Sequence, residues 1–239
     1  MPCTVLVGGF FGDEGKGKIV SYLALKDNAS AVVRGGVGPN AGHTVIWQGR
    51  EYRLRMLPSA FVSPQTRLLI GPGVLVNPKI LLDEIERTST GSRVGVDCNC
   101  AVIEEKHIQI DSGSDYLRGK IETTGTGCGP CMADRVNRIA KTAREIDLLA
   151  AYLTDVPLEV NELLDGGKTV LVEGTQGTFL SLFHGTYPFC TSKDVTAAAM
   201  CADVGIGPTK VSDVLVVFKA YTTRVGGGPL PSELAEDEI

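Results

Sequence analysis

Short apolar runs recur along the chain, and each ends at a glycine or a polar residue. Most have the β-branched composition and the length of roughly four to eight residues that a buried strand needs. One longer run contains Gly71-Pro72-Gly73, so it predicts a strand broken by a turn. The five runs are residues 4–7, 31–34, 67–76, 169–173 and 214–218.

Between these runs, apolar residues recur at helical spacing. Ile19 and Leu23 belong to such a pattern directly after the first glycines, and Pro78 stands where it would open a second helix. Residues 134–149 carry apolar side chains among basic ones and predict an amphipathic helix. Residues 158–164 predict a further helix.

Strands that alternate with helices favour an α/β fold in which helices flank a mostly parallel central sheet. The first strand runs into a glycine-rich loop and then a helix, which gives the sheet a P-loop-like start. The sequence shows no internal repeat, low-complexity tract or clear linker. We therefore expect residues 1–239 to form a single domain.

Composition narrows the classes of function. The chain has 239 residues with 23 Lys and Arg against 28 Asp and Glu, a net charge of −5. That balance argues against a general electrostatic grip on nucleic acid. No apolar stretch reaches the ~18 residues of a membrane helix, and the first residues do not look like a secretion signal. Glycine is in excess, at 29 residues, which indicates backbone that turns sharply or approaches a ligand.

Seven cysteines without a secretion signal favour reduced thiols and a cytoplasmic location. Cys128-Gly-Pro-Cys131 is the one spacing that invites a redox or zinc interpretation. The chain offers no second such pair beside it, so two thiols packed against a glycine-rich turn are favoured. Cys98 and Cys100 lie in an apolar, strand-like segment and are expected in the core.

The most informative stretch lies between the first strand and the first helix. Residues 8–18 read GGFFGDEGKGK, and their second half fits the G-x-x-x-x-G-K pattern of a phosphate-binding loop. Ile19 stands where such loops have the Ser or Thr that holds magnesium. Backbone N–H groups, the helix N-terminus and lysines would still attract phosphate oxygens. A simple helix-capping cluster is the alternative, and two lysines among three glycines disfavour it.

Asp13 is unusual in this loop, because a carboxylate in a phosphate cradle repels its own ligand. It makes sense as a Mg²⁺ ligand or as a general base acting on a second substrate.

A second glycine-rich loop ends at His43, between Asn40 and Thr44. Since carboxyl ends of parallel strands share one edge, we expect this loop beside the first. His43 would there donate to a phosphoryl oxygen or act as a general acid.

Three further polar segments complete the candidates. Residues 123–130 form a loop rich in glycine and hydroxyl groups, which suits either phosphate binding or a surface turn. Arg135, Arg138 and Lys141 follow at helical spacing, and residue chemistry alone makes this basic stripe a solvated face. Gln176 follows the strand 169–173 and is expected at the same sheet edge.

Taken together, these loops resemble the adenylosuccinate synthetase family over nearly the whole chain, and most closely its shorter archaeal-type members. Six ordered motifs carry the resemblance and are far more specific than one glycine-rich loop. They are residues 12–18, 40–44, 123–130, 173–177, 184–188 and 219–226.

The resemblance implies a ligase of AMP biosynthesis that works in two steps. GTP phosphorylates the 6-oxygen of IMP, and L-aspartate then displaces that phosphate to give adenylosuccinate. The family pattern makes Asp13 the general base and a Mg²⁺ ligand together with the Gly42 backbone, and makes His43 the general acid. It places Gln176 near the 6-oxygen, and it places Lys16, counted among the catalytic residues, in the cradle of the nucleotide phosphates. The implied partners include neither nucleic acid nor membrane.

The resemblance also implies two sets of binding residues. Those expected at GTP and Mg²⁺ are Gly12, Asp13, Glu14, Gly15, Lys16, Gly17, Lys18, Gly42, His43 and Thr44. Those expected at IMP are Asn40, Ala41, Gly42, His43, Thr124, Gln176 and Thr191, with Arg138 reaching the neighbour's IMP in a homodimer.

The chain departs from the family pattern in three places. Phe10-Phe11 replaces a more usual Gln-Trp, and Cys131-Met132 replaces small or aromatic residues. Family members also continue past residue 239, so we expect the C-terminal part of the family fold, with most aspartate and purine-base contacts, to be missing and this chain to be weakly active or inactive. The alternatives are a relative that uses dGMP or ATP, a non-catalytic nucleotide-binding fragment, and a redox protein.

Overall fold

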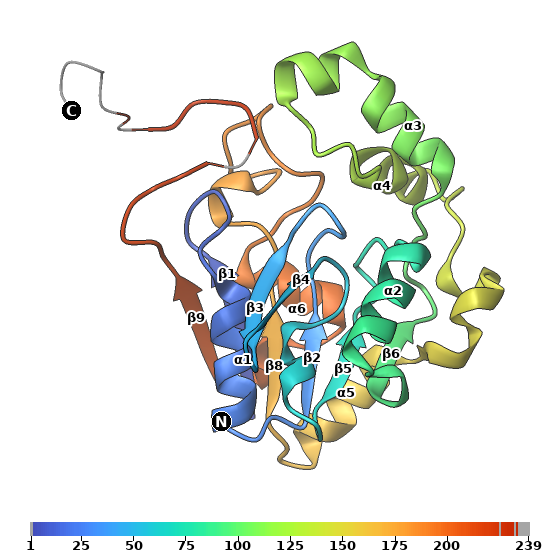
Figure 1. The fold of residues 1–239 in the computed structure, drawn as a ribbon, viewed down its shortest axis with the longest axis vertical. Coiled ribbons are helices and arrows are strands. Elements are labelled where there is room, and N and C mark those ends of the chain that lie inside the picture. Colours follow the sequence, from blue (N-terminus) through green and yellow to red (C-terminus); the bar gives the residue numbers. More distant parts are fainter. Residues whose placement is uncertain (1, 225, 232, 234–239) are drawn as a thin grey trace.

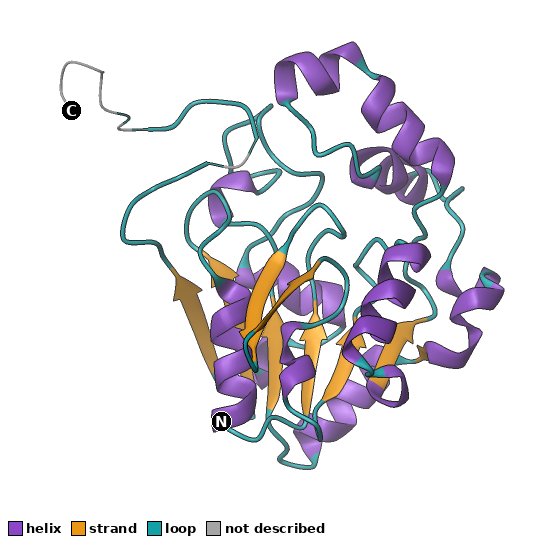
Figure 2. Cartoon of the chain, viewed as in Figure 1, coloured by secondary structure: helices purple, strands orange, loops and turns teal. Residues whose placement is uncertain are grey.

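The computed structural model describes residues 2–224, 226–231 and 233. Val225, which belongs to the last of the six motifs, lies outside the described residues. Figure 2 shows strands gathered in the centre and helices around them. Among the described residues, no helix has the length and apolar character needed to cross a membrane.

The central sheet has seven strands in the order β7-β6-β5-β2-β8-β1-β9, and every neighbouring pair is parallel. A separate antiparallel hairpin joins β3 to β4. The strands are β1 (Cys3–Gly8), β2 (Ala31–Arg34), β3 (His43–Trp47), β4 (Arg50–Leu54), β5 (Arg67–Ile70), β6 (Val94–Asp97), β7 (Leu153–Thr154), β8 (Val170–Glu173) and β9 (Asp213–Val217).

Helices cover both faces of this sheet (Figure 1). Alternating residues of β1 show why: Leu6 belongs to the core cluster that includes residues of α1 and α2, whereas Val5 and Val7 belong to the cluster that includes residues of α5 and α6. Successive side chains of a strand point to opposite faces, so strands apolar throughout need cover on both. The α-helices are α1 (Lys16–Lys26), α2 (Pro78–Thr88), α3 (Glu105–Gly113), α4 (Cys128–Val136), α5 (Val156–Asp165) and α6 (Ala197–Val204).

Most predicted elements are confirmed. The five apolar runs contain β1, β2, β5, β8 and β9, and the predicted turn follows β5. Pro78 opens α2, whose Asn77 cap accepts a hydrogen bond from the Ile80 N–H at 3.2 Å. The sheet is more regular than the sequence indicated, because all seven strands run parallel.

The predicted helix over residues 134–149 is wrong. Helix α4 ends at Val136, and Arg138 has a left-handed φ of 64°. The backbone beyond it pairs with the chain at Ala101, where Ala143 donates to the Cys100 carbonyl at 2.9 Å. A backbone bonded sideways in this way cannot continue a helix. The basic stripe of Arg135, Arg138 and Lys141 therefore does not form.

Cys98 and Cys100 differ from the expectation as well. Strand β6 ends at Asp97, so neither cysteine lies in a strand. Cys100 is fully buried as expected, whereas Cys98 is only half-buried.

The outer strand β9 leaves apolar side chains uncovered. Val214 and Val216 on this strand are 48% and 46% exposed.

Candidate functional site

A cavity of about 620 Å³ lies at the carboxyl edge of the sheet. The loops that follow β1, β2 and β8 meet there, as parallel strands predict. It is closed on the other side by the α3–α4 connection and by residues 187–192. The sequence-predicted residues that line it are Gly12, Asp13, Gly15, Lys16, Gly17, Lys18, Asn40, Ala41, Gly42, His43, Thr44, Thr124, Gln176 and Thr191.

The first loop curls tightly before α1. Gly12, Asp13 and Gly15 all have left-handed φ values, of 93°, 58° and 86°. Gly15 caps the helix, so the free N–H groups of the first turn open into the cavity. Asp13 lies on the exposed side of the loop. A non-glycine residue in this conformation is strained, which commonly marks a functional position.

Glu14 lies beneath the loop and not in the cavity, where the sequence had placed it. Its carboxylate accepts hydrogen bonds from the Gly12 N–H at 2.9 Å and the Phe10 N–H at 3.1 Å. The same carboxylate pairs with the Lys16 ammonium at 2.7 Å. Lys16 also donates to the Gln176 carbonyl. Burial lowers the pKa of Lys16, and the charge of Glu14 opposes that effect.

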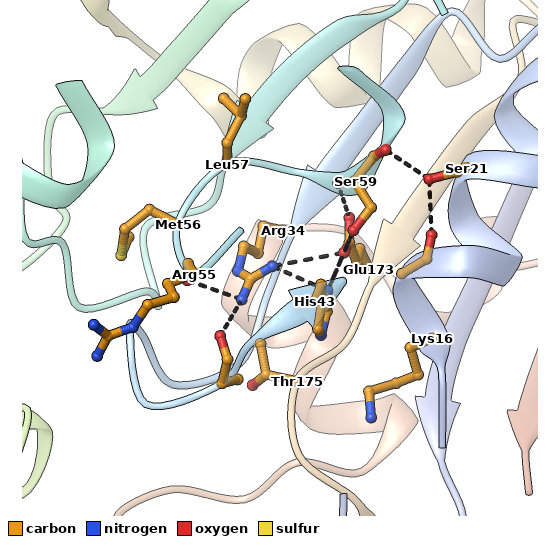
Figure 3. A network of polar contacts seen from close by, with 12 residues as sticks. Lys16, Ser21, Arg34, His43, Arg55, Met56, Leu57, Ser59, Glu173 and Thr175 are labelled. Carbon is orange, nitrogen blue, oxygen red and sulfur yellow. Dashed lines mark hydrogen bonds and ion pairs between the residues drawn. The ribbon is translucent and has the colours of Figure 1, made fainter. Parts of the chain in front are cut away.

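Glu173 holds His43 in place, and Figure 3 shows the two side chains in contact. The buried Glu173 carboxylate accepts hydrogen bonds from the Ser59 N–H at 2.8 Å and the Ser59 hydroxyl at 2.6 Å. It also contacts Nδ1 of His43. The Arg34 guanidinium, which can only donate, also lies 3.2 Å from Nδ1. The carboxylate can only accept and lies closer to Nδ1, so we assign the proton to Nδ1, which leaves Nε2 of the neutral ring as an acceptor.

Arg34 balances the charge of Glu173. Its guanidinium is fully buried and lies 3.6 Å from the Glu173 carboxylate. It donates to the Arg55 carbonyl at 3.0 Å and the Ala41 carbonyl at 3.2 Å. Arg55 and the next two residues are fixed in turn by the Glu84 carboxylate of α2. The core therefore supports the position of Arg34 from two sides.

These surroundings make His43 neutral. Burial lowers its pKa, the nearby Arg34 lowers it further, and Glu173 opposes both. Arg34 already neutralises the charge of Glu173. A protonated His43 would therefore be a second buried cation with no carboxylate left to balance it. The pKa of Glu173 is lowered as well: burial alone would raise it, but contact with His43 and Arg34 outweighs burial. Nε2 of His43 is buried and has no hydrogen-bond partner among the residues that the structure describes, although His43 lines the cavity.

A second polar chain crosses the floor of the cavity. The Gln176 amide donates to the Asn40 side-chain oxygen at 3.1 Å, and the Asn40 amide donates to the Thr191 hydroxyl at 3.2 Å. These three residues come from three separate loops. Their contact brings together residues that lie up to 151 positions apart in the chain.

The third loop forms the opposite side of the cavity. Thr124 is exposed there, and its hydroxyl lies 3.1 Å from that of Thr126. Asp111 of α3 ties down both ends of this loop, accepting from the Thr123 hydroxyl and the Gly127 N–H, each at 2.8 Å. This segment belongs to the cavity, so its interpretation as a mere surface turn is not favoured.

The chemistry of the donors fits a magnesium ion better than a soft metal. The described residues contain no group of three or more His, Cys, Asp or Glu that could hold a metal. Asp13 and Gly42 nevertheless line one cavity. Apart from its two chain neighbours, none of the described residues comes within 4 Å of the Cβ position that Gly42 lacks. One carboxylate, a carbonyl and substrate phosphates make a usual Mg²⁺ site.

The Cys128-Gly-Pro-Cys131 pair does not fit a redox site. Burial raises the pKa of Cys128 to about 11 and that of Cys131 to about 12. Reactive thiols need a lowered pKa, because the thiolate is the nucleophile. Both side chains pack beside the third loop, where the Cys131 thiol contacts the Val102 carbonyl at 3.4 Å.

Sequence reasoning gave no role to Arg34, Asp111 or Glu173. A signal for two of them was present, since Arg34 and Glu173 are charged residues that end otherwise apolar buried strands. Asp111 gave no such signal. Arg138 is exposed and does not line this cavity, so the expectation that it serves a neighbouring subunit stays a prediction.

Comparison with known proteins finds relatives along the whole chain. The family model for adenylosuccinate synthetase matches residues 5–150 and 139–239. The adenylosuccinate synthetase of Archaeoglobus fulgidus is 57% identical over 238 residues, which cover 100% of this chain and 71% of the relative. That of Pyrococcus horikoshii is 55% identical over 241 residues, with the same coverage of 100% and 71%.

Solved structures resemble the fold. The fully ligated adenylosuccinate synthetase of Plasmodium falciparum superposes with a TM-score of 0.90 at 28% identity, covering 98% of this chain and 65% of that one. The cyanophage S-2L succinoaminodeoxyadenylate synthetase, bound to dGMP and dATP, gives a TM-score of 0.78 at 28% identity, covering 91% and 63%. This chain therefore spans less than two thirds of either solved chain.

Proposed function

This chain belongs to the adenylosuccinate synthetase family, and we propose that its cavity joins IMP to L-aspartate at the expense of GTP. In this reaction GTP phosphorylates the 6-oxygen of IMP, and the aspartate amine then displaces that phosphate. The observation that carries the proposal is the meeting of three loops in one cavity lined by His43, whose buried Nε2 has no partner within the described part of the chain.

The first loop binds the phosphates of GTP. The free N–H groups at the start of α1 and the Lys16 ammonium supply positive potential. In the unliganded loop Lys16 pairs with Glu14 and the Gln176 carbonyl. Phosphate oxygens must therefore compete with these partners for the Lys16 N–H groups. Glu14 keeps the loop in shape through its bonds to the backbone.

Asp13 acts as the general base on N1 of IMP, which makes the 6-oxygen nucleophilic. Its carboxylate is exposed in the cavity, as proton transfer to a bound substrate requires. Asp13 and the backbone of Gly42 would also hold Mg²⁺. That ion, when bound, neutralises charge on the phosphate oxygens.

His43 stabilises the transferred phosphoryl group through Nε2. The resting ring is neutral and holds its proton at Nδ1, against Glu173. Approach of a phosphate dianion favours a second proton at Nε2, because opposite charge raises a histidine pKa. His43 then donates to a phosphoryl oxygen, and Glu173 keeps the ring in place.

Asn40, Thr124, Gln176 and Thr191 hold IMP in this proposal. All four line the cavity, and three are joined by hydrogen bonds before any ligand binds.

We also propose a homodimer in which Arg138 reaches the neighbour's IMP. Arg138 lies between Val136 and Ile139 in the sequence, and both of these apolar side chains are exposed. Exposed apolar side chains beside Arg138 suit a contact between subunits. A cytoplasmic location completes the proposal, consistent with seven free cysteines.

The test is turnover by the purified chain with IMP, aspartate, GTP and Mg²⁺, followed as adenylosuccinate absorbance and GDP release. We expect slow turnover that falls at least about 100-fold in Asp13→Asn, since a general base contributes roughly that much. Asp13→Asn should unfold at the same temperature as the wild type, because Asp13 is exposed. Absence of product, together with absence of IMP binding, would refute the proposed function.

The same assay separates the proposed substrates from those of the phage-type relatives. The cyanophage structure contains dGMP and dATP, whereas the relatives that are more than 50% identical to this chain are adenylosuccinate synthetases. Assays with dGMP in place of IMP, and with ATP in place of GTP, should therefore give the lower rates. A higher rate with dGMP would reassign the substrate.

A further inference from the structure

A nearly buried lysine, Lys193, lies two residues beyond Thr191 and has no role in the function proposed above. Its side chain is 11% exposed. The ammonium donates to the Gly73 carbonyl and the Asp203 carboxylate, each at 2.5 Å, and to the Gly36 carbonyl at 3.3 Å. All three N–H bonds of the ammonium are thus directed at acceptors. Lys193 therefore connects three segments that are distant in the sequence.

Asp203 completes the same clasp from helix α6. One of its oxygens pairs with Lys193, and the other accepts a hydrogen bond from the Gly36 N–H at 2.8 Å. The pair therefore holds Gly36 by both its N–H and its carbonyl. Burial raises the pKa of Asp203, and the charge of Lys193 opposes that effect. Each charged group thus needs the other in order to stay buried.

Gly36 is a position where a small displacement matters. It has a φ of +90°, and a Cβ atom there would lie 1.9 Å from the Thr175 hydroxyl oxygen. The next residue, Val37, donates its N–H to that same oxygen at 3.0 Å. The Thr175 hydroxyl in turn donates to the Gln176 side-chain oxygen at 2.5 Å.

The clasp thus closes a ring of contacts. From Gly36 the chain leads to Val37, whose N–H bonds to Thr175. The contacts then run from Thr175 to Gln176, Asn40 and Thr191, and the chain leads from Thr191 back to Lys193, which donates to the Gly36 carbonyl. The members that face the cavity are Asn40, Gln176 and Thr191. No side chain of the phosphate loop at residues 12–18 takes part in these bonds, although Lys16 touches the Gln176 backbone.

We propose that Lys193, paired with Asp203, is a positioning residue that sets the geometry of Asn40, Gln176 and Thr191 for a purine nucleoside monophosphate. This inference rests on the proposed function and deepens it. Lys193 itself does not line the cavity, so its effect passes through the backbone at Gly36 and through Thr191. Its removal should weaken the monophosphate side of the cavity and leave the triphosphate side nearly unchanged.

The test compares Lys193→Met with a matched control by calorimetric titration of IMP and, separately, of GTP with Mg²⁺. We expect Lys193→Met to weaken IMP binding about tenfold, the effect of one or two misplaced hydrogen bonds. GTP binding should change less than about twofold. The control is Lys210→Met, which breaks a 2.7 Å pair with Asp165 whose carboxylate is 70% exposed. That variant should bind both nucleotides like the wild type.

A second variant separates positioning from simple stability. Lys193→Met alone leaves Asp203 buried and unpaired, so it should unfold at a lower temperature. Lys193→Met with Asp203→Asn removes both charges and should recover part of that stability, while IMP binding stays weak. Recovery of IMP binding together with stability would overturn the proposal, and so would an equal loss for IMP and GTP.

The remaining outcomes are also decisive. A folded Lys193→Met chain that binds IMP as tightly as the wild type would overturn the role of Lys193 and leave the proposed function intact. If neither variant folds, the clasp is purely structural and the proposal is wrong. If the wild type binds no IMP while GTP still binds, the proposed function fails first, and the role of Lys193 fails with it.

Discussion

The two sides of the cavity are built differently. The inner wall consists of the lining residues Lys16, His43 and Gln176, together with Arg34 and Glu173 behind them, and all five are buried. Arg34 and Glu173 contact each other and His43 (Figure 3), and Lys16 donates to the Gln176 carbonyl. The outer wall is the segment 116–126. Its side chains are exposed or half-buried, and a single π-helical turn at Leu117–Ile121 gives it regular structure.

This difference separates two tasks. Buried charged groups are costly unless fully paired, and once paired they fix one geometry. The inner wall therefore suits groups that must meet a reacting phosphate at a defined angle. The outer wall is exposed or half-buried and is attached through Asp111. Variants of the inner wall should affect both stability and the rate of reaction, whereas variants of the outer wall should affect mainly substrate affinity.

The largest effect is expected from Glu173→Gln. This change leaves Arg34 buried without its counter-charge and frees the His43 ring. Stability should fall by about 3–5 kcal/mol, the usual cost of removing one partner of a buried pair. The kcat should fall at least about 100-fold, because the general acid loses its orientation. Urea unfolding and initial rates measure the two effects.

Glu51→Gln is the matched control for that variant. Glu51 pairs with Arg53 at the surface, where the two side chains are 46% and 79% exposed. Surface pairs contribute little to stability, so this variant should match the wild type in unfolding and in kcat. Equal behaviour of Glu173→Gln and Glu51→Gln would contradict the assignment of Glu173 to a rigid inner wall.

A smaller effect is expected from pH. Burial, together with Arg34, lowers the pKa of His43 from 6.5 to about 4. Between those values the unfolded chain binds more protons than the folded one, so stability rises with pH. The stabilisation is complete above pH 6.5 and is lost as pH falls towards 4, by up to about 1.4 kcal/mol per pH unit.

Denaturant unfolding at several pH values between 5 and 7 measures this slope. His43→Asn should make the slope shallower, and His184→Asn, which removes an exposed imidazole, should leave it unchanged. A slope that becomes shallower in His43→Asn but not in His184→Asn would assign the pH dependence of stability to the His43 of the inner wall. A slope that survives in His43→Asn would place the titrating group elsewhere in the chain.

The smallest effect is expected at the outer wall, from Asp111→Asn. An amide oxygen replaces only part of the carboxylate's bonding to Thr123 and Gly127, so the loop that carries Thr124 loosens. The KM for IMP should rise about five- to tenfold with little change in kcat, and stability should fall by about 1 kcal/mol. Asp115→Asn, an exposed neighbour, controls for charge. A large loss of kcat in Asp111→Asn would show that the two walls are not separate.

Much of the fold could be predicted from the sequence, because buried parallel strands are continuous apolar runs. Residues 4–7 and 31–34 lie within β1 and β2, as their composition indicated. The helix predicted over 134–149 failed, since apolar spacing cannot reveal that the backbone near Ala143 bonds to Cys100. The hairpin of β3 and β4 was not predicted either, because its strands, HTVIW and REYRL, have only five residues each and the first shows no regular alternation of apolar and polar positions.

The candidate site divides in the same way. Glycines, lysines and Asp13 in the first loop could be found from sequence, because phosphate binding requires those residue types at short spacing. The pairing of Glu173 with His43, 130 positions apart, could not. Nor could the burial of Glu14, which places beneath the loop a carboxylate that the sequence had assigned to the cavity.

By itself, the sequence determined the alternation of strands and helices, the order of the loops at one sheet edge, and the residue types that face a phosphate. These properties follow from local patterns, in which neighbours along the chain decide the outcome. Only the tertiary structure decided the neutral state of His43, the attachment of Asp111 to the third loop and the clasp of Lys193 with Asp203. Those properties depend on burial and on charges contributed by distant segments, and the free energy of a buried charge is set by everything that surrounds it.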